Sequence, residues 1–292
     1  FQINTHLASG NPDENPYVET VARGLRFLLT QLRTEDIDVQ TYGDPDTNGN
    51  GIGIQASVPS HPPYQSGIVM MALAATSTPL ETAHAGVTNV KGRLFYDILT
   101  DMVDMYAWGQ SDSGNNRGGW RYRWNEGPDN SACQWGALGM EAAEEAFNIH
   151  VPEFVKEQNK IWLDHSWDGT GWGYAGRGNG VATTPSGLAQ VAFIDLPKTD
   201  WRWINATGYM AQQWDSWYND SRNYYALYAM AKALRIGLPD ETVILGEGTP
   251  WAIDWYRDND RGAARTVLTD QRDDGSFGVT GQGTTWLSSI TP

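Results

Sequence analysis

The sequence contains very little cysteine. Cys133 is the single cysteine among 292 residues. One thiol cannot form a disulfide within the chain, and it cannot supply the ligands of a cysteine zinc site or an iron–sulfur cluster. The five histidines show neither HxxxH nor HExxH spacing, so a histidine-based metal centre is not expected.

Long apolar runs are also missing. No stretch reaches the length of about 18 apolar residues that a transmembrane helix needs, so membrane insertion is not expected. Residues 1–16 lack the basic start and the apolar stretch of a signal peptide, and removal of a leader before Phe1 stays open. We expect an N-terminal extension over 1–16 and a single domain over 17–292.

Positive charge is scarce. Lys and Arg number 20 against 35 Asp and Glu, which gives a formal net charge of −15. Nucleic acid and anionic membrane surfaces are poor partners for such a chain, because like charges repel. Acidity and low cysteine content together favour an extracellular or cell-surface location.

Apolar residues recur at helical spacing, without sustained two-residue alternation. In residues 17–33, for example, Val18, Val21, Leu25, Leu28 and Leu32 form one stripe. We therefore predict an all-α protein. The expected helices are 17–33, 63–76, 91–108, 131–147, 151–166, 185–195, 200–215, 222–236 and 251–270.

The chain contains internal repeats. Four of the expected helices open alike, with Ser or Asn followed six residues later by Ala, at 66–73, 131–138, 186–193 and 223–230. The openers are expected to be N-caps. Gly-rich loops carry an aromatic residue at positions 120, 172 and 277. The second interval is about twice the first, so the intervals correspond to about one and two lengths of a single repeat. Such repetition indicates an array of helical hairpins.

Three segments resemble the QW motif of the prenyltransferase and squalene-cyclase repeat family. Gln271–Phe277 (QRDDGSF) has Phe277 in place of the motif's tryptophan, Arg23–Gln31 resembles its first half, and Lys160–Leu163 leading into Gly169–Trp172 is a third copy. The resemblance covers 17–292 and implies an α/α toroid with Gly/Trp-rich loops. In that architecture, inner helices surround a central cavity and QW-like loops brace its rim.

The catalytic motifs of the well-known branches of this family are missing. The chain has no Asp-x-Asp-Asp acid of a terpenoid cyclase and no Cys-Gly-Glu-Gln thioester, and Cys133 lacks the aspartate that accompanies a prenyltransferase zinc cysteine. Because a fold does not determine an activity, function must be sought in particular residues.

The segment Asp44–Gly51 (DPDTNGNG) has the pattern of a calcium loop. Oxygen-bearing side chains alternate and are followed by a glycine, so we predict a structural Ca²⁺ bound by Asp44, Asp46, Asn48 and Asn50. The twelfth position holds Gln55 rather than the bidentate glutamate of an EF-hand. A metal-free turn built on Asp and Asn side chains is the alternative.

The toroid would direct the N-termini of its inner helices to one mouth of the cavity. The predicted catalytic residues there are Asp129, Arg222 and Tyr224. Aromatic rings and arginines in the adjoining segments would bind sugars by stacking and hydrogen bonding. This predicted substrate-binding set is Tyr64, Trp120, Tyr122, Trp124, Trp172, Tyr174 and Arg177.

Structural roles compete with these functional ones. Asp129 has the features of a helix cap, and Trp120 and Trp172 those of rim packing in a QW-like loop. The segment Asp129–Ala132 also resembles a short motif of toroid-type pectate lyases.

The residues leave three functions open. The first is binding and cleavage of a polysaccharide, as a hydrolase with two carboxylates or a lyase with an Arg or Tyr base. The second is a non-catalytic extracellular scaffold or self-assembling surface protein, and the third a terpenoid cyclase-like enzyme. The expected partners are a glycan or other ligand and further copies of the chain.

Overall fold

The computed structural model describes residues 16–57, 61–219, 223–237 and 244–276. This part of the chain is mostly helical and carries two small antiparallel sheets. Within it, no helix combines the length and apolar character needed to cross a membrane. The chain divides into two compact units, Phe1–Trp162 and Leu163–Pro292. A toroid of helical hairpins remains an expectation from the resemblance.

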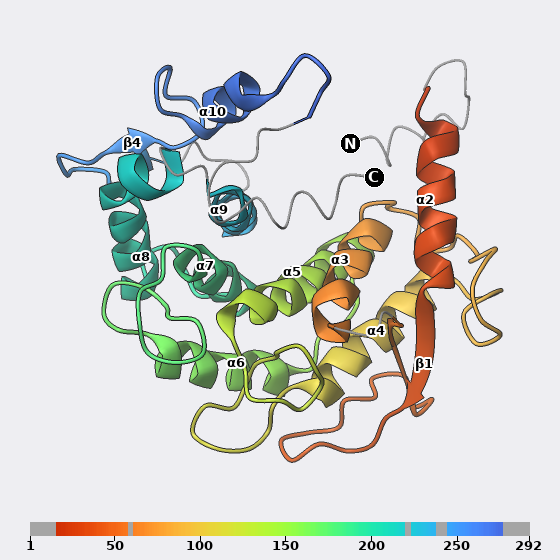
Figure 1. Ribbon diagram of the computed structural model, residues 1–292. Coiled ribbons are helices and arrows are strands. Elements are labelled where there is room, and N and C mark those ends of the chain that lie inside the picture. Colours follow the sequence, from red (N-terminus) through yellow and green to blue (C-terminus); the bar gives the residue numbers. More distant parts are fainter. Residues whose placement is uncertain (1–15, 58–60, 220–222, 238–243, 277–292) are drawn as a thin grey trace. The chain divides into compact units, whose positions relative to one another are not determined.

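The first unit combines helices with a two-stranded sheet (Figure 1). The antiparallel strands β1 and β2 pair Leu32 with Ala56 and Asp36 with Ile52. Helix α3 packs on α5, and α4 packs on β2. The elements are α2 (Val18–Thr30), β1 (Leu32–Asp36), β2 (Ile52–Ala56), α3 (Pro62–Ala74), α4 (Phe95–Gly109), α5 (Asn130–Phe147) and α6 (Glu153–Ser166), which continues into the second unit.

Glycines allow α3 and α5 to pack closely. A Cβ atom at Gly67 would collide with the backbone carbonyl of Trp135 on α5. A Cβ atom at Gly139 on α5 would lie 2.9 Å from the Cα of Gly67, well inside contact distance. The two helices can approach this closely because neither glycine has a side chain.

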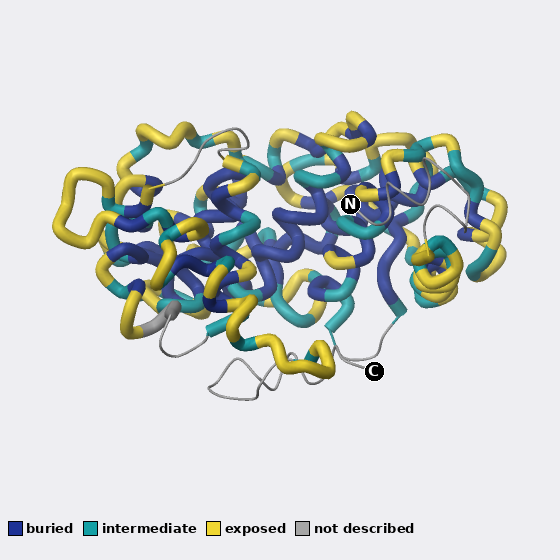
Figure 2. Tube along the Cα trace, turned by 90° about the horizontal axis from the view of Figure 1, so that it is seen from above, coloured by how far each residue is buried: buried dark blue, intermediate teal, exposed yellow. Residues whose placement is uncertain are grey.

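The second unit is built around α7. Helix α7 packs on both α8 and α9, and a short β3–β4 ladder pairs Leu245 with Ile253. The elements are α7 (Thr183–Phe193), α8 (Trp201–Gln212), the π-helix η1 (Trp214–Asn219), α9 (Tyr224–Gly237), β3 (Ile244–Leu245), β4 (Ile253–Asp254) and α10 (Ala263–Asp270). Figure 2 shows buried residues concentrated in the central helices, and exposed residues in the loops and along α2.

Most of the predicted helices are confirmed, and two are wrong in part. The first ends at Thr30, and residues 32–36 form β1 instead of a last helical turn. The expected helix over 251–270 is helical only from Ala263, because the preceding residues form β4 and turns. The sheet escaped prediction because β2, of sequence IGIQA, is buried over most of its length and lacks an alternating pattern.

The predicted caps are also corrected. Helix α3 begins at Pro62, so Ser66 lies inside it, where its hydroxyl accepts a hydrogen bond of 2.9 Å from the Ala56 N–H of β2. Ser131 and Ser186 likewise lie within helices. Asn223 fits the expectation, since its side-chain oxygen accepts from the Ala226 N–H at 3.1 Å.

Candidate functional site

The two predicted subsite tryptophans of the Gly-rich loops are core residues. Trp120 and Trp172 are both 0 % exposed. The indole N–H of Trp120 donates to the Tyr106 carbonyl at 2.9 Å, and that of Trp172 donates to the Leu163 carbonyl at 3.1 Å. Neither ring has a free face for a sugar, so their assignment to substrate binding is corrected. Both brace a loop against the last turn of the preceding helix.

The same loops are tied to the helix that follows. The Trp120 N–H donates to the Cys133 thiol at 3.1 Å, and the Trp172 N–H donates to the Thr184 hydroxyl at 3.3 Å. Burial raises the pKa of the Cys133 thiol well above its ordinary value, which keeps it protonated and unreactive. The two Gly-rich loops therefore have the same structural role, which is to connect the helix before the loop with the helix after it.

Asp129, predicted to be catalytic, is the N-cap of α5. Its Oδ1 accepts from the Ala132 N–H at 2.9 Å and from the Ser131 hydroxyl at 2.6 Å. The residue is 0 % exposed, and Arg121 approaches its Oδ2 at 3.6 Å. A carboxylate enclosed in this way has no open position for a substrate, so its catalytic assignment is replaced by a capping role.

The other predicted binding residues of the first unit pack against their neighbours. Tyr64 is 5 % exposed, and its ring lies 5.0 Å from that of Trp135. Tyr122 meets His61 edge to face at 4.3 Å. Trp124 is half-buried and donates to Gln55 Oε1 at 2.8 Å. The remaining two, Tyr174 and Arg177, are exposed on the 173–180 loop of the second unit.

Tyr224 is the predicted catalytic residue that borders an open cavity. It lies at the start of α9, and its hydroxyl donates to Asp270 Oδ2 at 2.5 Å. The cavity has a volume of about 510 Å³ and lies between α9, α10 and the residues before α10. Its other lining residues are Leu227, Tyr228, Ala231, Trp255, Tyr256, Ala263, Ala264, Val267 and Leu268. Arg222, the third predicted catalytic residue, lies outside the described residues.

The aromatic side chains of this cavity differ in exposure. Tyr256 is 52 % exposed and Trp255 is 7 % exposed. Burial raises the pKa of Tyr228 to about 12, and the Lys232 ammonium lies 5.7 Å from the centre of its ring. Burial also lowers the pKa of Lys232. The cavity therefore offers aromatic faces and few charges.

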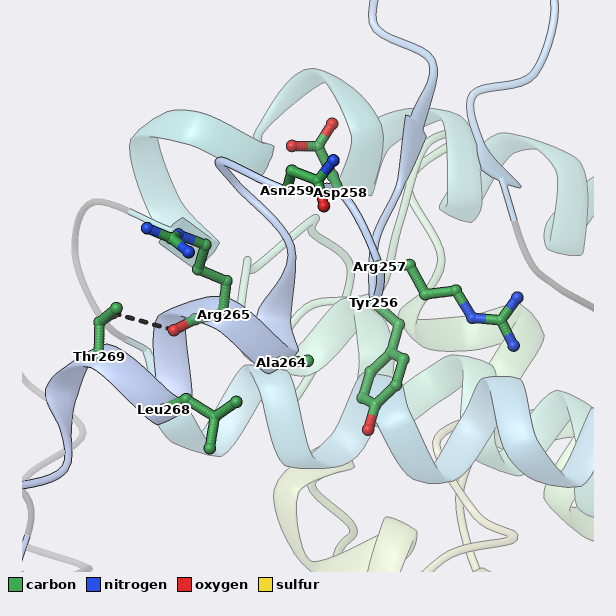
Figure 3. A pocket seen from close by; sticks show the side chains of 8 residues that line it. All are labelled: Tyr256, Arg257, Asp258, Asn259, Ala264, Arg265, Leu268 and Thr269. Carbon is green, nitrogen blue, oxygen red and sulfur yellow. Dashed lines mark hydrogen bonds between the residues drawn. The ribbon is translucent and has the colours of Figure 1, made fainter.

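A second, smaller hollow of about 320 Å³ adjoins this cavity and shares Tyr256, Ala264 and Leu268 with it. Figure 3 shows Arg257 and Arg265 of this hollow pointing away from each other, so they form no joint site for an anionic group. Asp258 is engaged by the backbone N–H groups of Arg261 and Asp260, which lower the pKa of its carboxyl.

Sequence reasoning missed most of this site. Tyr228, Tyr256 and Asp270 were not predicted, and the expectation of one helix over 251–270 concealed the turn that carries Trp255 and Tyr256. One signal was available. Tyr224 and Tyr228 are four residues apart, a spacing that places both side chains on one face of a helix.

The predicted calcium loop forms the segment that leads into β2. The Asp46 carboxylate accepts from the N–H groups of Gly49, Asn50 and Gly51 at 2.7–3.2 Å, and Asp44 Oδ1 accepts from the Asp46 N–H at 3.1 Å. Within the described parts of the chain, no three His, Cys, Asp or Glu side chains form a ready metal-binding group. A cation at this loop would therefore need amide or backbone oxygens in addition to carboxylates.

Comparisons with known protein families, with characterised proteins and with solved structures find no match for this chain. The resemblance to the toroid family rests on its sequence motifs alone.

Proposed function

We propose that this chain binds a polysaccharide in the aromatic cavity between α9 and α10. The observation that carries the proposal is that one open cavity of about 510 Å³ is lined by the rings of Tyr228, Tyr256 and Tyr224, and that the Tyr224 hydroxyl is bonded to Asp270. Sugar rings stack their apolar faces on aromatic side chains and direct their hydroxyls to polar groups. Tyr224 and Asp270 supply such polar groups at the edge of the stacking surface.

The charge of the chain favours a neutral polysaccharide. A net charge of −15 repels a polyanion such as a polyuronate. The two arginines of the adjoining hollow do not converge to offset that repulsion (Figure 3). Among the glycans, a neutral chain is therefore the better fit.

As the second part of the proposal, Tyr224 and Asp270 are the residues that would cleave the bound polysaccharide. Hydrolysis of a glycosidic bond ordinarily requires two carboxyl groups about 5–10 Å apart. None of the described residues that line the cavity carries a carboxylate. Asp270 is bonded to the lining residue Tyr224, and Asp258 belongs to the adjoining hollow. Binding is consequently better supported than hydrolysis, and a lyase reaction would require a uronate that the charge disfavours.

Affinity electrophoresis in gels containing soluble xylan, β-glucan, mannan or polygalacturonate tests binding. We expect a neutral polysaccharide to retard the protein. Tyr256→Ala should weaken that binding about three- to ten-fold, as expected for loss of one stacking ring. Trp251→Ala is the control, because Trp251 is equally exposed, at 51 %, but lies outside the cavity. Binding that is absent, or unaffected by Tyr256→Ala, would reject this site.

A reducing-end assay on the retained polysaccharide tests cleavage. We expect Tyr224→Phe to abolish product release while retardation in the gel persists, since the ring remains and the hydroxyl is lost. A wild-type chain that binds without releasing product would limit the function to binding.

The scaffold function is a second candidate, favoured by the burial of Trp120 and Trp172. These residues, expected in an open cleft, instead brace loops on helices. Defined oligomers in sedimentation velocity, together with no retardation by any glycan, would favour this alternative.

A further inference from the structure

Two aspartates of α4 face the loop 44–51. The Asp104 Oδ1 accepts from the Thr47 N–H at 3.2 Å and from the Thr47 hydroxyl at 2.8 Å. The Asp101 Oδ1 accepts from the side-chain amides of Asn48 at 2.8 Å and Asn50 at 3.0 Å. Both aspartates are 0 % exposed. Two carboxylates are thus buried beneath a loop that itself carries Asp46.

The charges of these two carboxylates are balanced unequally. Asp101 Oδ2 forms an ion pair of 2.6 Å with Arg93. Asp104 Oδ2 is buried and has no hydrogen-bond partner among the residues that the structure describes. A buried oxygen of this kind is costly unless a proton or a cation is placed beside it.

We propose that a Ca²⁺ ion binds between the loop 44–51 and α4, with Asp104 as its buried ligand. The other ligands are the Asp101 and Asp46 carboxylates and the amide oxygens of Asn48 and Asn50. Because the three carboxylates form no ready metal group in the described residues, we propose that they draw together around the ion. The two amides turn over on binding, so that their oxygens face the ion where their N–H groups now face Asp101. This extends the loop-only calcium prediction to two helix residues that take the place of an EF-hand glutamate.

The donor chemistry selects calcium. All the proposed ligand atoms are oxygens, and Ca²⁺ binds six to eight oxygens in a flexible geometry. Mg²⁺ demands a stricter octahedral arrangement, and Zn²⁺ prefers nitrogen and sulfur. The ion would connect an exposed loop to α4, the helix that packs on β2, and so stabilise the first unit.

Calorimetric titration of the full chain, first stripped with chelator, tests the site with Ca²⁺ alone. We expect one ion per chain and a thermal unfolding midpoint that rises by about 5 °C at a hundred-fold excess over the dissociation constant. Absence of binding and of a shift would overturn the proposal. An equal response to Mg²⁺ would overturn the assignment to calcium.

Asp104→Asn separates a ligand from a structural residue. We expect at least ten-fold weaker Ca²⁺ binding, with an unfolding midpoint in chelator that is equal to or above that of the wild type, since a buried charge is removed. Asp97→Asn, on the same helix but without a described bond to the loop, should leave binding unchanged. Asp46→Asn, on the loop, is a second variant and should weaken binding as well. Wild-type affinity in both Asp104→Asn and Asp46→Asn would refute the site.

Discussion

At the residue scale, the surroundings of a buried side chain determine its role. Asp129 and Asp104 are both aspartates with 0 % exposure, yet their surroundings differ. Each has one oxygen without a hydrogen-bond partner among the described residues. Asp129 caps α5 through the Ala132 N–H and has Arg121 3.6 Å from that oxygen, whereas Asp104 lies beneath an acidic loop with no described ion pair. The first arrangement is typical of a structural residue, and the second favours a cation.

The capping role of Asp129 leads to the first prediction. Asp129→Ala should lower the free energy of unfolding by about 1–2 kcal/mol, because the Ala132 N–H loses its acceptor. Asp129→Asn should have a much smaller effect, since asparagine is also a good N-cap. Urea unfolding measures both. Loss of polysaccharide binding in a stable Asp129→Asn chain would restore a functional role for this residue.

Glycine at the α3–α5 contact leads to the second prediction. Gly67→Ala should destabilise the chain by about 1–3 kcal/mol, because the added methyl group meets the Trp135 carbonyl and forces the helices apart. Gly24→Ala is the matched control. Gly24 lies in α2, and no atom of the described residues lies within 4 Å of a Cβ added there, so alanine should stabilise the chain by about 0.5–1 kcal/mol. Urea unfolding curves with the same sign for both variants would contradict the packing argument.

At the scale of elements, the tryptophan loops hold consecutive helices together. Each loop is bonded to the helix before it through an indole N–H and to the helix after it through a backbone N–H. In the second unit, the Trp172 ring also lies against Gly187 of α7, where any Cβ would collide with it. The loop and the helix therefore depend on each other.

The third prediction tests this brace. Trp172→Phe should lower the free energy of unfolding by about 2–4 kcal/mol, because it leaves a cavity and an unpaired Leu163 carbonyl. Trp251→Phe, at a residue 51 % exposed, should change it by less than about 0.5 kcal/mol. Similar unfolding midpoints for the two variants in guanidinium would argue against a bracing role.

At the scale of the whole molecule, the dominant property is its charge. A net charge of −15 creates repulsion throughout the folded chain. Several of its ion pairs, such as Arg33–Glu35 and Arg261–Asp215, are substantially exposed and contribute little to stability. Repulsion should therefore outweigh these attractions.

The fourth prediction concerns salt. In chelator, raising NaCl from about 10 mM to about 150 mM should raise the thermal unfolding midpoint, because the Debye length shortens from about 30 Å to about 8 Å and screens the repulsion. KCl should act equally if screening is the cause. A midpoint that falls with salt would show that ion pairs dominate over net charge.

The sequence by itself determined the features that depend on neighbouring residues. Helical periodicity predicted most helices. The Gly-rich loops predicted a repeated structural role for their tryptophans, and Asp44–Gly51 predicted a turn rich in side-chain oxygens. Each of these signals is local, since a few consecutive residues determine both the backbone conformation and its hydrogen bonds. The helix expected over 251–270 was wrong where turns overrode its apolar spacing.

Only the tertiary structure decided which side chains are available for function. It enclosed Trp120, Trp172 and Asp129, and it paired Tyr224 with Asp270 and Asp104 with Thr47. These pairs are separated by tens of residues, so no local pattern could indicate them. Burial and charge balance arise only when distant segments pack, because the loss of solvent depends on the atoms that each segment brings to the other.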